Sequence, residues 1–290
     1  MKVRFASIVF CISVIANVSF AQSSILWEIT GNGVTTPSYL MGTLKFIGER
    51  EFFIPKNAEE KLKQCKMFVI EDPVDHHAQH ELNNAVHFEK GKSLKTELSA
   101  EDYEKVTALF NREFGITPDQ FESDYARMIP LALSITMTRL SLGEQVMFYD
   151  IELLRLAKDN KLSTYSLEPI QREAEAIHKF PMKDQITSLM HNVGNFEKQK
   201  EEFRKLMEIY PSGDLHQIFE YTLHPVDNNP VFIEEFYTKR NLEWIPKIEK
   251  MVHDRPAFIA VGVSHLEGDK GVLKLLQEKG YTLTPIAVTR

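Results

Sequence analysis

The feature of this sequence with the clearest chemical potential is a histidine in a glycine-rich turn. His265 follows an apolar, β-branched run, residues 258–263, whose pattern predicts a buried strand. Gly268 and Gly271 come next, and apolar residues at helical spacing begin at Val272. In α/β proteins, ligands bind outside the carboxyl ends of strands, and glycine there lets the backbone approach the ligand. His265 is therefore either a site residue or an ordinary surface-loop histidine.

Two further charged side chains stand where other predicted strands end. The apolar run 67–70 predicts a strand that ends in Glu71. A carboxylate at such a tip is either a site residue or a solvated strand end. Lys45 lies three residues after Gly42, just beyond the strand predicted over 38–41. An imidazole, a carboxylate and an ammonium are groups that move protons or bind ions.

A guanidinium joins this set from the helical part of the chain. Apolar spacing predicts a helix over residues 231–252, which carries Arg240, Asn241 and Trp244. Proline removes a backbone donor and clashes with the preceding turn, so Pro246 predicts a kink or a break in this helix.

These residues depend on strands from both ends of the chain. Apolar or alternating runs bounded by turn residues predict six strands, over residues 26–29, 38–41, 67–70, 162–167, 258–263 and 281–288. We expect an α/β (α+β) fold with a central mixed β-sheet, formed by N- and C-terminal segments 22–75 and 255–290. The mostly helical middle, about residues 76–254, should form a cap or a second lobe.

The first 21 residues have the pattern of a signal peptide. Lys2 and Arg4 precede an uncharged apolar run, and Ser19 and Ala21 are small residues where a signal peptidase cuts. We expect cleavage after Ala21 and a periplasmic or secreted chain without a stable membrane span, because the run is shorter than the ~20 residues that a span needs. Retention as an uncleaved anchor is the alternative.

Composition excludes some partners and some architectures. The net charge of −7 argues against nucleic acid or anionic lipid, since both require a basic footprint. Hydrophobic residues make up 43% of the chain, which is ample for a packed core. After signal cleavage only Cys65 remains, so an internal disulfide is excluded, and we expect this thiol to be buried.

Several of these patterns, in this order, resemble the TraB/GumN family. The resemblance rests on Leu26-Trp27-x-Ile29-x-Gly31-Asn32-Gly33, Gly42-Thr43, Val69-Ile70-Glu71, Arg240-Asn241 with Trp244, and Val261-Gly262-x-x-His265. It spans nearly the whole mature chain, and its two end motifs are the most specific. The family includes the Tiki proteases, which resemble metal-dependent peptidases, and is similar in fold to erythromycin esterases.

The resemblance implies a core of two facing Gly-x-x-His motifs, a glutamate and an arginine around a divalent metal. Applied to this sequence, the resemblance implies that His265 and Glu71 are the metal ligands. It also implies that Arg240 holds a substrate carboxylate or a developing oxyanion. Imidazole and carboxylate suit Zn, Mn or Co, which would activate a water for hydrolysis. Asp150 is similar to another recurrent polar position of the family. The implied function is a metal-dependent, peptidase-like hydrolase.

One departure from the family pattern bears on that function. The first motif ends in Lys45 where the family has histidine, and an ammonium has no lone pair for a metal. Lys45 is expected to pair with Glu71 as a buried, fixed cation, which would leave a degenerate site without metal. Alternatively it is a desolvated catalytic base at an active site. The second function is therefore a non-catalytic member (a pseudoenzyme) that binds a peptide or small-molecule ligand, or a protein, in the same cleft.

Overall fold

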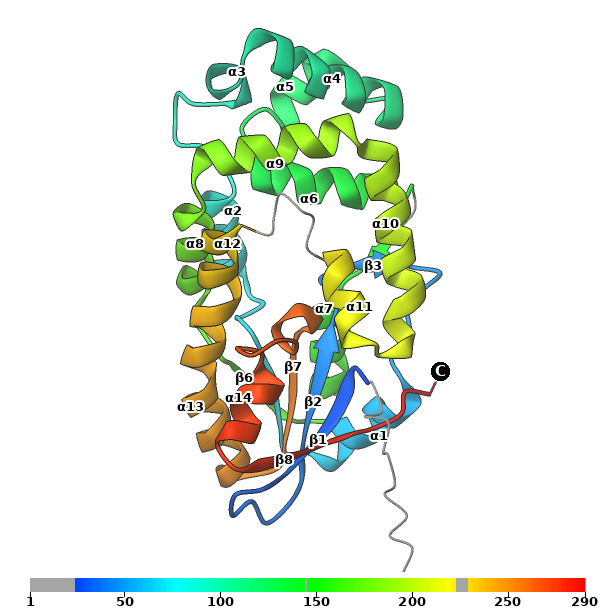
Figure 1. The fold of residues 1–290 in the computed structure, drawn as a ribbon, viewed down its shortest axis with the longest axis vertical. Coiled ribbons are helices and arrows are strands. Elements are labelled where there is room, and N and C mark those ends of the chain that lie inside the picture. The colour runs from blue at the N-terminus through cyan, green and yellow to red at the C-terminus, as the bar shows by residue number, and fades with distance from the viewer. Residues whose placement is uncertain (1–23, 144, 223–228, 290) are drawn as a thin grey trace, which may run out of the picture.

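A six-stranded mixed sheet lies at the base of the molecule (Figure 1). The computed structural model describes residues 24–143, 145–222 and 229–289, so the predicted signal peptide lies outside the described residues. The strand order is β6-β4-β7-β2-β1-β8. The bounds are β1 (Leu26–Gly31), β2 (Ser38–Thr43), β4 (Met67–Ile70), β6 (Ser163–Ser166), β7 (Ala257–Gly262) and β8 (Tyr281–Pro285). The predicted mixed sheet is confirmed.

Four neighbouring strands run in the same direction. β7 pairs in parallel with both β2 and β4, and β4 pairs in parallel with β6. β1 runs antiparallel to β2 and to β8, and its hairpin with β2 turns through Gly31 and Gly33, both at positive φ. The carboxyl ends of β2, β7, β4 and β6 therefore meet at one edge. The edge strand β6 comes from the helical middle of the chain, whereas the other five strands come from its N- and C-terminal segments.

Helices on the two faces of the sheet complete the main hydrophobic core. They include α1 (Lys56–Gln64), α7 (Tyr149–Asp159), α13 (Lys239–Asp254) and α14 (Val272–Glu278). The strands are buried on both faces, which explains their continuous apolar sequence. Phe68 of β4 stacks on Phe258 of β7, with ring centroids 6.3 Å apart. Cys65 is buried and free, as predicted.

The middle of the chain forms a helical lobe beyond the carboxyl edge of the sheet (Figure 1). Its helices are α2 (His76–Ala85), α3 (Leu94–Glu97), α4 (Ala100–Phe114), α5 (Pro118–Asp124), α6 (Pro130–Ser141), α8 (Ile170–Lys179), α9 (Met182–Gly194), α10 (Phe196–Ile209), α11 (Leu215–Thr222) and α12 (Pro230–Ile233). A second hydrophobic core, which includes Phe110 and Phe121, fills this lobe. Two short strands, β3 (Ile47–Gly48) and β5 (Val146–Met147), pair beside it.

The helix that carries Arg240 differs from its prediction. α12 continues through a π-helical turn, η2 (Glu234–Thr238), into α13, which runs on to Asp254 with Pro246 inside it. The prediction was a kink or a break, and the break is wrong because α13 continues past Pro246. The carbonyl that loses its partner belongs to Leu242, and this residue is exposed, so water can satisfy it. The irregularity lies upstream, in the π-helical turn.

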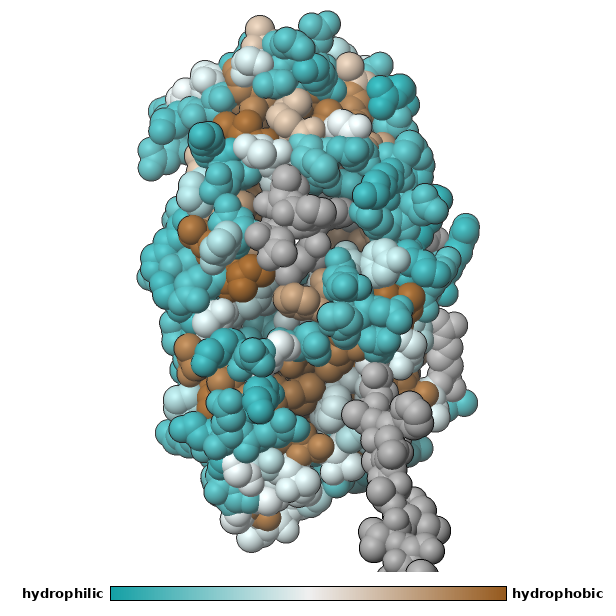
Figure 2. Space-filling view, in the orientation of Figure 1, coloured by the Kyte–Doolittle hydropathy of each residue, from teal (hydrophilic) through white to brown (hydrophobic). Residues whose placement is uncertain are grey.

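The surface shown in Figure 2 is mostly hydrophilic, in keeping with the net charge of −7, and hydrophobic side chains show only in separate patches. Within the described ranges, no helix is both long and apolar enough to cross a membrane.

Candidate functional site

The carboxyl edge of the parallel strands carries the chemically reactive side chains. Lys45 follows β2, Glu71 follows β4, Glu168 follows β6, and His265 follows β7 within a short 3-10 turn, η3 (Val263–His265). This edge is where open α/β sheets bind ligands, because loops from adjacent strands diverge there.

Two glycines bring the neighbouring loops of β2 and β7 into contact. In the parallel register Gly42 lies opposite Val261, and the next pair includes Gly262. A Cβ on Gly42 would lie 2.7 Å from Leu266 Cδ1 and 3.1 Å from Val263 Cα. The loop after β7 packs onto the end of β2 only because that side chain is absent. The two Gly-x-x motifs of the sequence therefore face each other.

Arg240 is the centre of the site's charge network. Its side chain is 4% exposed, and its Nη2 lies 2.9 Å from Glu71 Oε2 and 2.8 Å from Glu168 Oε1. Its Nη1 donates to the carbonyl of Phe236 in the π-helical turn, and the guanidinium lies over the Trp244 ring. Glu168 Oε2 accepts from the Trp244 indole at 2.7 Å. Two carboxylates thus satisfy one buried cation.

Glu71 is an ionised carboxylate with both oxygens engaged. Oε2 accepts from Arg240, and Oε1 accepts from the backbone N–H of Gly262. Burial opposes ionisation, but the neighbouring cationic groups and the Gly262 donor lower the pKa of Glu71 to about 2. This carboxylate is therefore a fixed negative charge and a weak base.

His265 lies beneath the surface of the site, beside Glu71 and Arg240. Its residue exposure is 4%, and its Nε2 is 3.8 Å from Glu71 Oε1 and 3.5 Å from Arg240 Nη1. Burial disfavours the imidazolium and lowers the pKa of His265 to about 3. The ring is neutral at physiological pH, and Asn241 Oδ1 lies 2.6 Å from its Nδ1.

Lys45 does not form the buried pair with Glu71 that the sequence predicted. Its Nζ lies 2.9 Å from Glu173 Oε1, and its side chain is 58% exposed. Glu173 reaches the site from α8 in the helical lobe. Glu71 is already paired with Arg240. The adjacent Glu173 carboxylate raises the pKa of Lys45, so the lysine stays charged. Lys45 is an accessible cation at the rim of the site.

Two further carboxyl groups share the rim. Burial and then Glu173 raise the pKa of Asp72 to about 8. Burial and then the charge of Glu71 raise the pKa of Asp150, in the first turn of α7, to about 7. Strongly perturbed groups in one place are typical of functional sites.

The side chains at this edge do not fit the metal centre that the family resemblance implies. Both oxygens of Glu71 are engaged, His265 Nε2 faces the guanidinium of Arg240, and the Lys45 ammonium has no lone pair. Within residues 24–143, 145–222 and 229–289, no group of three or more His, Cys, Asp or Glu side chains is arranged to hold a metal ion. The metal-ligand roles of His265 and Glu71 stay predictions.

The structure places Glu71, Arg240 and His265 together and Lys45 at their edge, and it adds residues that the sequence analysis missed. Glu168 follows a predicted strand as Glu71 does, so the same strand-end pattern was available to find it. Glu173 had no such signal, because it lies within a helix whose packing against the sheet edge is a tertiary feature.

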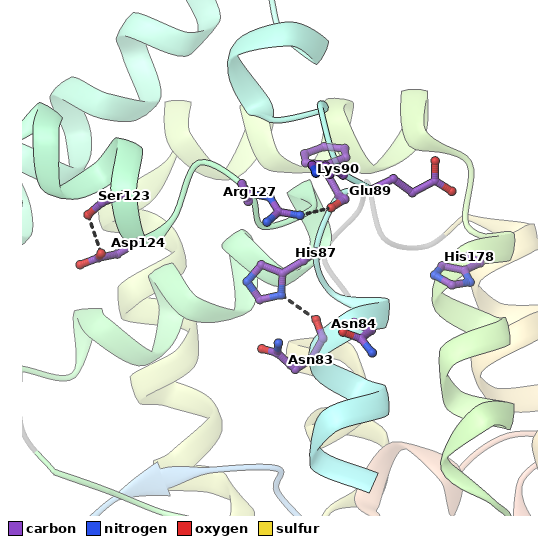
Figure 3. Close-up of a pocket in the computed structure, with 10 residues that line it drawn as sticks. Asn83, Asn84, His87, Glu89, Lys90, Ser123, Asp124, Arg127 and His178 are labelled. Carbon is purple, nitrogen blue, oxygen red and sulfur yellow. Dashed lines mark hydrogen bonds between the residues drawn. The ribbon is translucent and has the colours of Figure 1, made fainter. Parts of the chain in front are cut away.

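A hollow lies in the helical lobe (Figure 3). It has a volume of about 600 Å³, and its lining includes His87, Arg127 and His178 but none of the predicted site residues. Most of its lining residues are polar, the hollow is partly open to solvent, and we assign it no role.

A comparison with protein-family models places the whole arrangement in a known group. The model described as the TraB/PrgY/gumN family matches residues 25–285, a range that includes all six strands of the sheet and every residue of the site. A search of curated proteins and a search of solved structures found no match. The chain therefore belongs to the TraB/PrgY/gumN family, as its motifs predicted.

Proposed function

We propose that this chain is a hydrolase that uses the carboxyl group of Asp150 for proton transfer and the charge of Lys45 to stabilise an oxyanion. The observation that carries the proposal is the position of Asp150, beside Thr43 and Glu71, with its pKa raised to about 7. A general acid–base works best when its pKa lies near the working pH. Peptides are the proposed substrates because the family resemblance includes peptidases.

Asp150 and Lys45 have separate roles in the proposed reaction. The carboxylate of Asp150 takes a proton from the attacking water and gives it to the leaving amine. The exposed ammonium of Lys45 stabilises the negative charge that develops on the scissile carbonyl oxygen. Arg240 is too buried to contact substrate, so it supports the site by holding Glu71 ionised and in place.

Hydrolysis of a peptide library, followed by mass spectrometry, tests the proposal. Asp150→Asn should reduce kcat by about 10²–10⁴-fold, the range attributed to general acid–base groups. Asp159→Asn is a matched control, because Asp159 lies on the same helix with a side chain 64% exposed. A chelator should not change the rate. Full activity of Asp150→Asn, or the absence of any cleavage by the wild type, contradicts the proposal.

A second candidate is a non-catalytic, ligand-binding member of the family. It is favoured by the internal pairing of the site's cations, Arg240 with two glutamates and Lys45 with Glu173, and by the burial of His265. In that case peptides from the library should raise the Tm of wild type and Asp150→Asn equally, without being cleaved.

A further inference from the structure

Asn241 lies under the site with its side-chain amide fixed in one orientation. The residue is 1% exposed. Its Nδ2 donates to the backbone carbonyls of His265, at 3.3 Å, and Lys270, at 2.8 Å. Rotating the amide by half a turn would direct its oxygen at two carbonyl oxygens, which cannot donate. The hydrogen-bond network therefore assigns Oδ1 to the position 2.6 Å from His265 Nδ1.

This orientation determines which nitrogen of His265 carries the proton. An amide oxygen only accepts, so Nδ1 must donate to it, and Nε2 of the neutral ring keeps its lone pair. The lone pair faces Arg240 Nη1, a donor, at 3.5 Å. The ring cannot turn over easily, since its centroid lies 4.5 Å from the Trp244 ring and 5.0 Å from the Tyr237 ring.

The same ring completes the surroundings of Arg240. Glu168 and Glu71 hold its Nε and Nη2, which leaves Nη1 to the Phe236 carbonyl and His265 Nε2. A proton on Nε2 would place two donors against each other. A buried chain of contacts thus runs from Asn241 through His265 and Arg240 to Glu71.

We propose that Asn241 is a positioning residue that fixes the Nδ1-protonated tautomer of His265, so that this ring accepts from Arg240 and keeps it on Glu71. This inference deepens the proposed function, and its link to catalysis rests on that function. The tautomer itself does not, so it can be measured on a protein without activity.

The test is a long-range ¹H–¹⁵N correlation spectrum of protein with ¹⁵N-labelled histidine, in which His265→Gln identifies the His265 signals among those of 10 histidines. The wild type should show protonated Nδ1 and unprotonated Nε2. Asn241→Leu, which removes the acceptor, should move the two ring nitrogens toward averaged shifts. Asn241→Asp, which keeps an acceptor at Nδ1 but loses the donor to the two carbonyls, should keep Nδ1 protonated.

Asn195→Leu is the matched control, because Asn195 is an exposed asparagine whose amide lies 3.5 Å from His191 Nδ1. It should leave the His265 signals unchanged. A wild-type spectrum with Nε2 protonated, or an Asn241→Leu spectrum that keeps the pure tautomer, overturns the inference. The wild-type measurement does not use Asn241→Leu, so it can overturn the inference even if that variant misfolds.

Discussion

At the scale of single residues, Lys45 places a positive charge at the rim of the site. An ammonium paired with Glu173 and 58% exposed cannot act as a metal ligand, whereas it can contact a substrate. Burial and then the charge of Glu173 raise the pKa of Asp72 to about 8, so this carboxyl group holds a proton near neutral pH, while the charge of Lys45 opposes the rise. The charge of Lys45 lowers the pKa of the neighbouring carboxyl groups Glu71, Asp72 and Asp150, so it acts on the whole edge.

The first prediction concerns Lys45→His. The variant loses the ammonium and gains an imidazole, so that Mn²⁺ can compete with Arg240 for Glu71 and His265. It should bind Mn²⁺ at least about tenfold more tightly than the wild type, since even outer-shell partners contribute 10–100-fold. Calorimetric titration of the two proteins measures the difference. Lys45→Ala is the control and should gain nothing. Tight binding by the wild type, unchanged in the histidine variant, contradicts the prediction.

The second prediction concerns Asp150 and pH. Its pKa rises from 3.8 to about 7 on folding, so between these values the folded chain binds more protons than the unfolded chain, and stability falls as the pH rises. Asp150→Asn removes this loss. The free energy of unfolding in urea should favour the variant by more at pH 8 than at pH 5, with a difference above about 1 kcal/mol. The same change in Asp159→Asn would refute the assignment.

A site residue could be predicted from the sequence where its position depends on local sequence, and not where it depends on tertiary packing. Glu71 and His265 were found because strand-end positions are local in sequence, and parallel neighbours then meet at one edge. Glu173 could not be found, because the contact depends on how α8 of the helical lobe approaches the sheet. The predicted pairing of Lys45 with Glu71 was wrong for the same reason, because the observed partner is Glu173. Arg240 was assigned to the site through the family motif. The π-helical turn that precedes it, Glu234–Thr238, has no sequence signal that we recognise.

At the scale of elements, the site depends on the close approach of β2 to the turn after β7. The register of these two strands places both Gly-x-x motifs side by side, and the absence of a side chain at Gly42 allows Val263 and Leu266 to pack there. The π-helical turn before α13 contributes from the other side, since its Phe236 carbonyl and Tyr237 ring contact Arg240 and His265. Extra residues in such turns are common at functional sites.

The third prediction tests this approach with Gly42→Ala. The added methyl group overlaps Leu266 and the Val263 backbone, and overpacking of this kind costs about 1–3 kcal/mol. Chemical denaturation measures the loss. Gly194→Ala is the control, since a Cβ there meets nothing within 4 Å and alanine suits a helix better than glycine. Equal stability of the two variants would show that β2 and the turn after β7 have room between them.

At the scale of the whole molecule, the described residues form two separate hydrophobic cores. One includes the strands and the helices that flank them, and the other fills the helical lobe, with residues from α2–α6 and α8–α10. The charged network lies at the carboxyl edge of the sheet. Glu173 comes from α8 of the helical lobe, and Arg240 comes from α13, which flanks the sheet. A substrate at this edge would therefore contact residues from both parts.

The last prediction concerns where the folded part of the chain begins. Ser24 Oγ donates to the Ile286 carbonyl at 2.5 Å, and Ile25 is fully buried, so the sheet core already includes these two residues. The cleavage predicted after Ala21 falls just before them. We expect N-terminal sequencing of the mature protein to begin at Gln22. A chain that begins at Leu26 should lose about 1.5–3 kcal/mol from the missing burial of isoleucine alone. A membrane-bound product that keeps Met1 would show that the apolar run is an anchor.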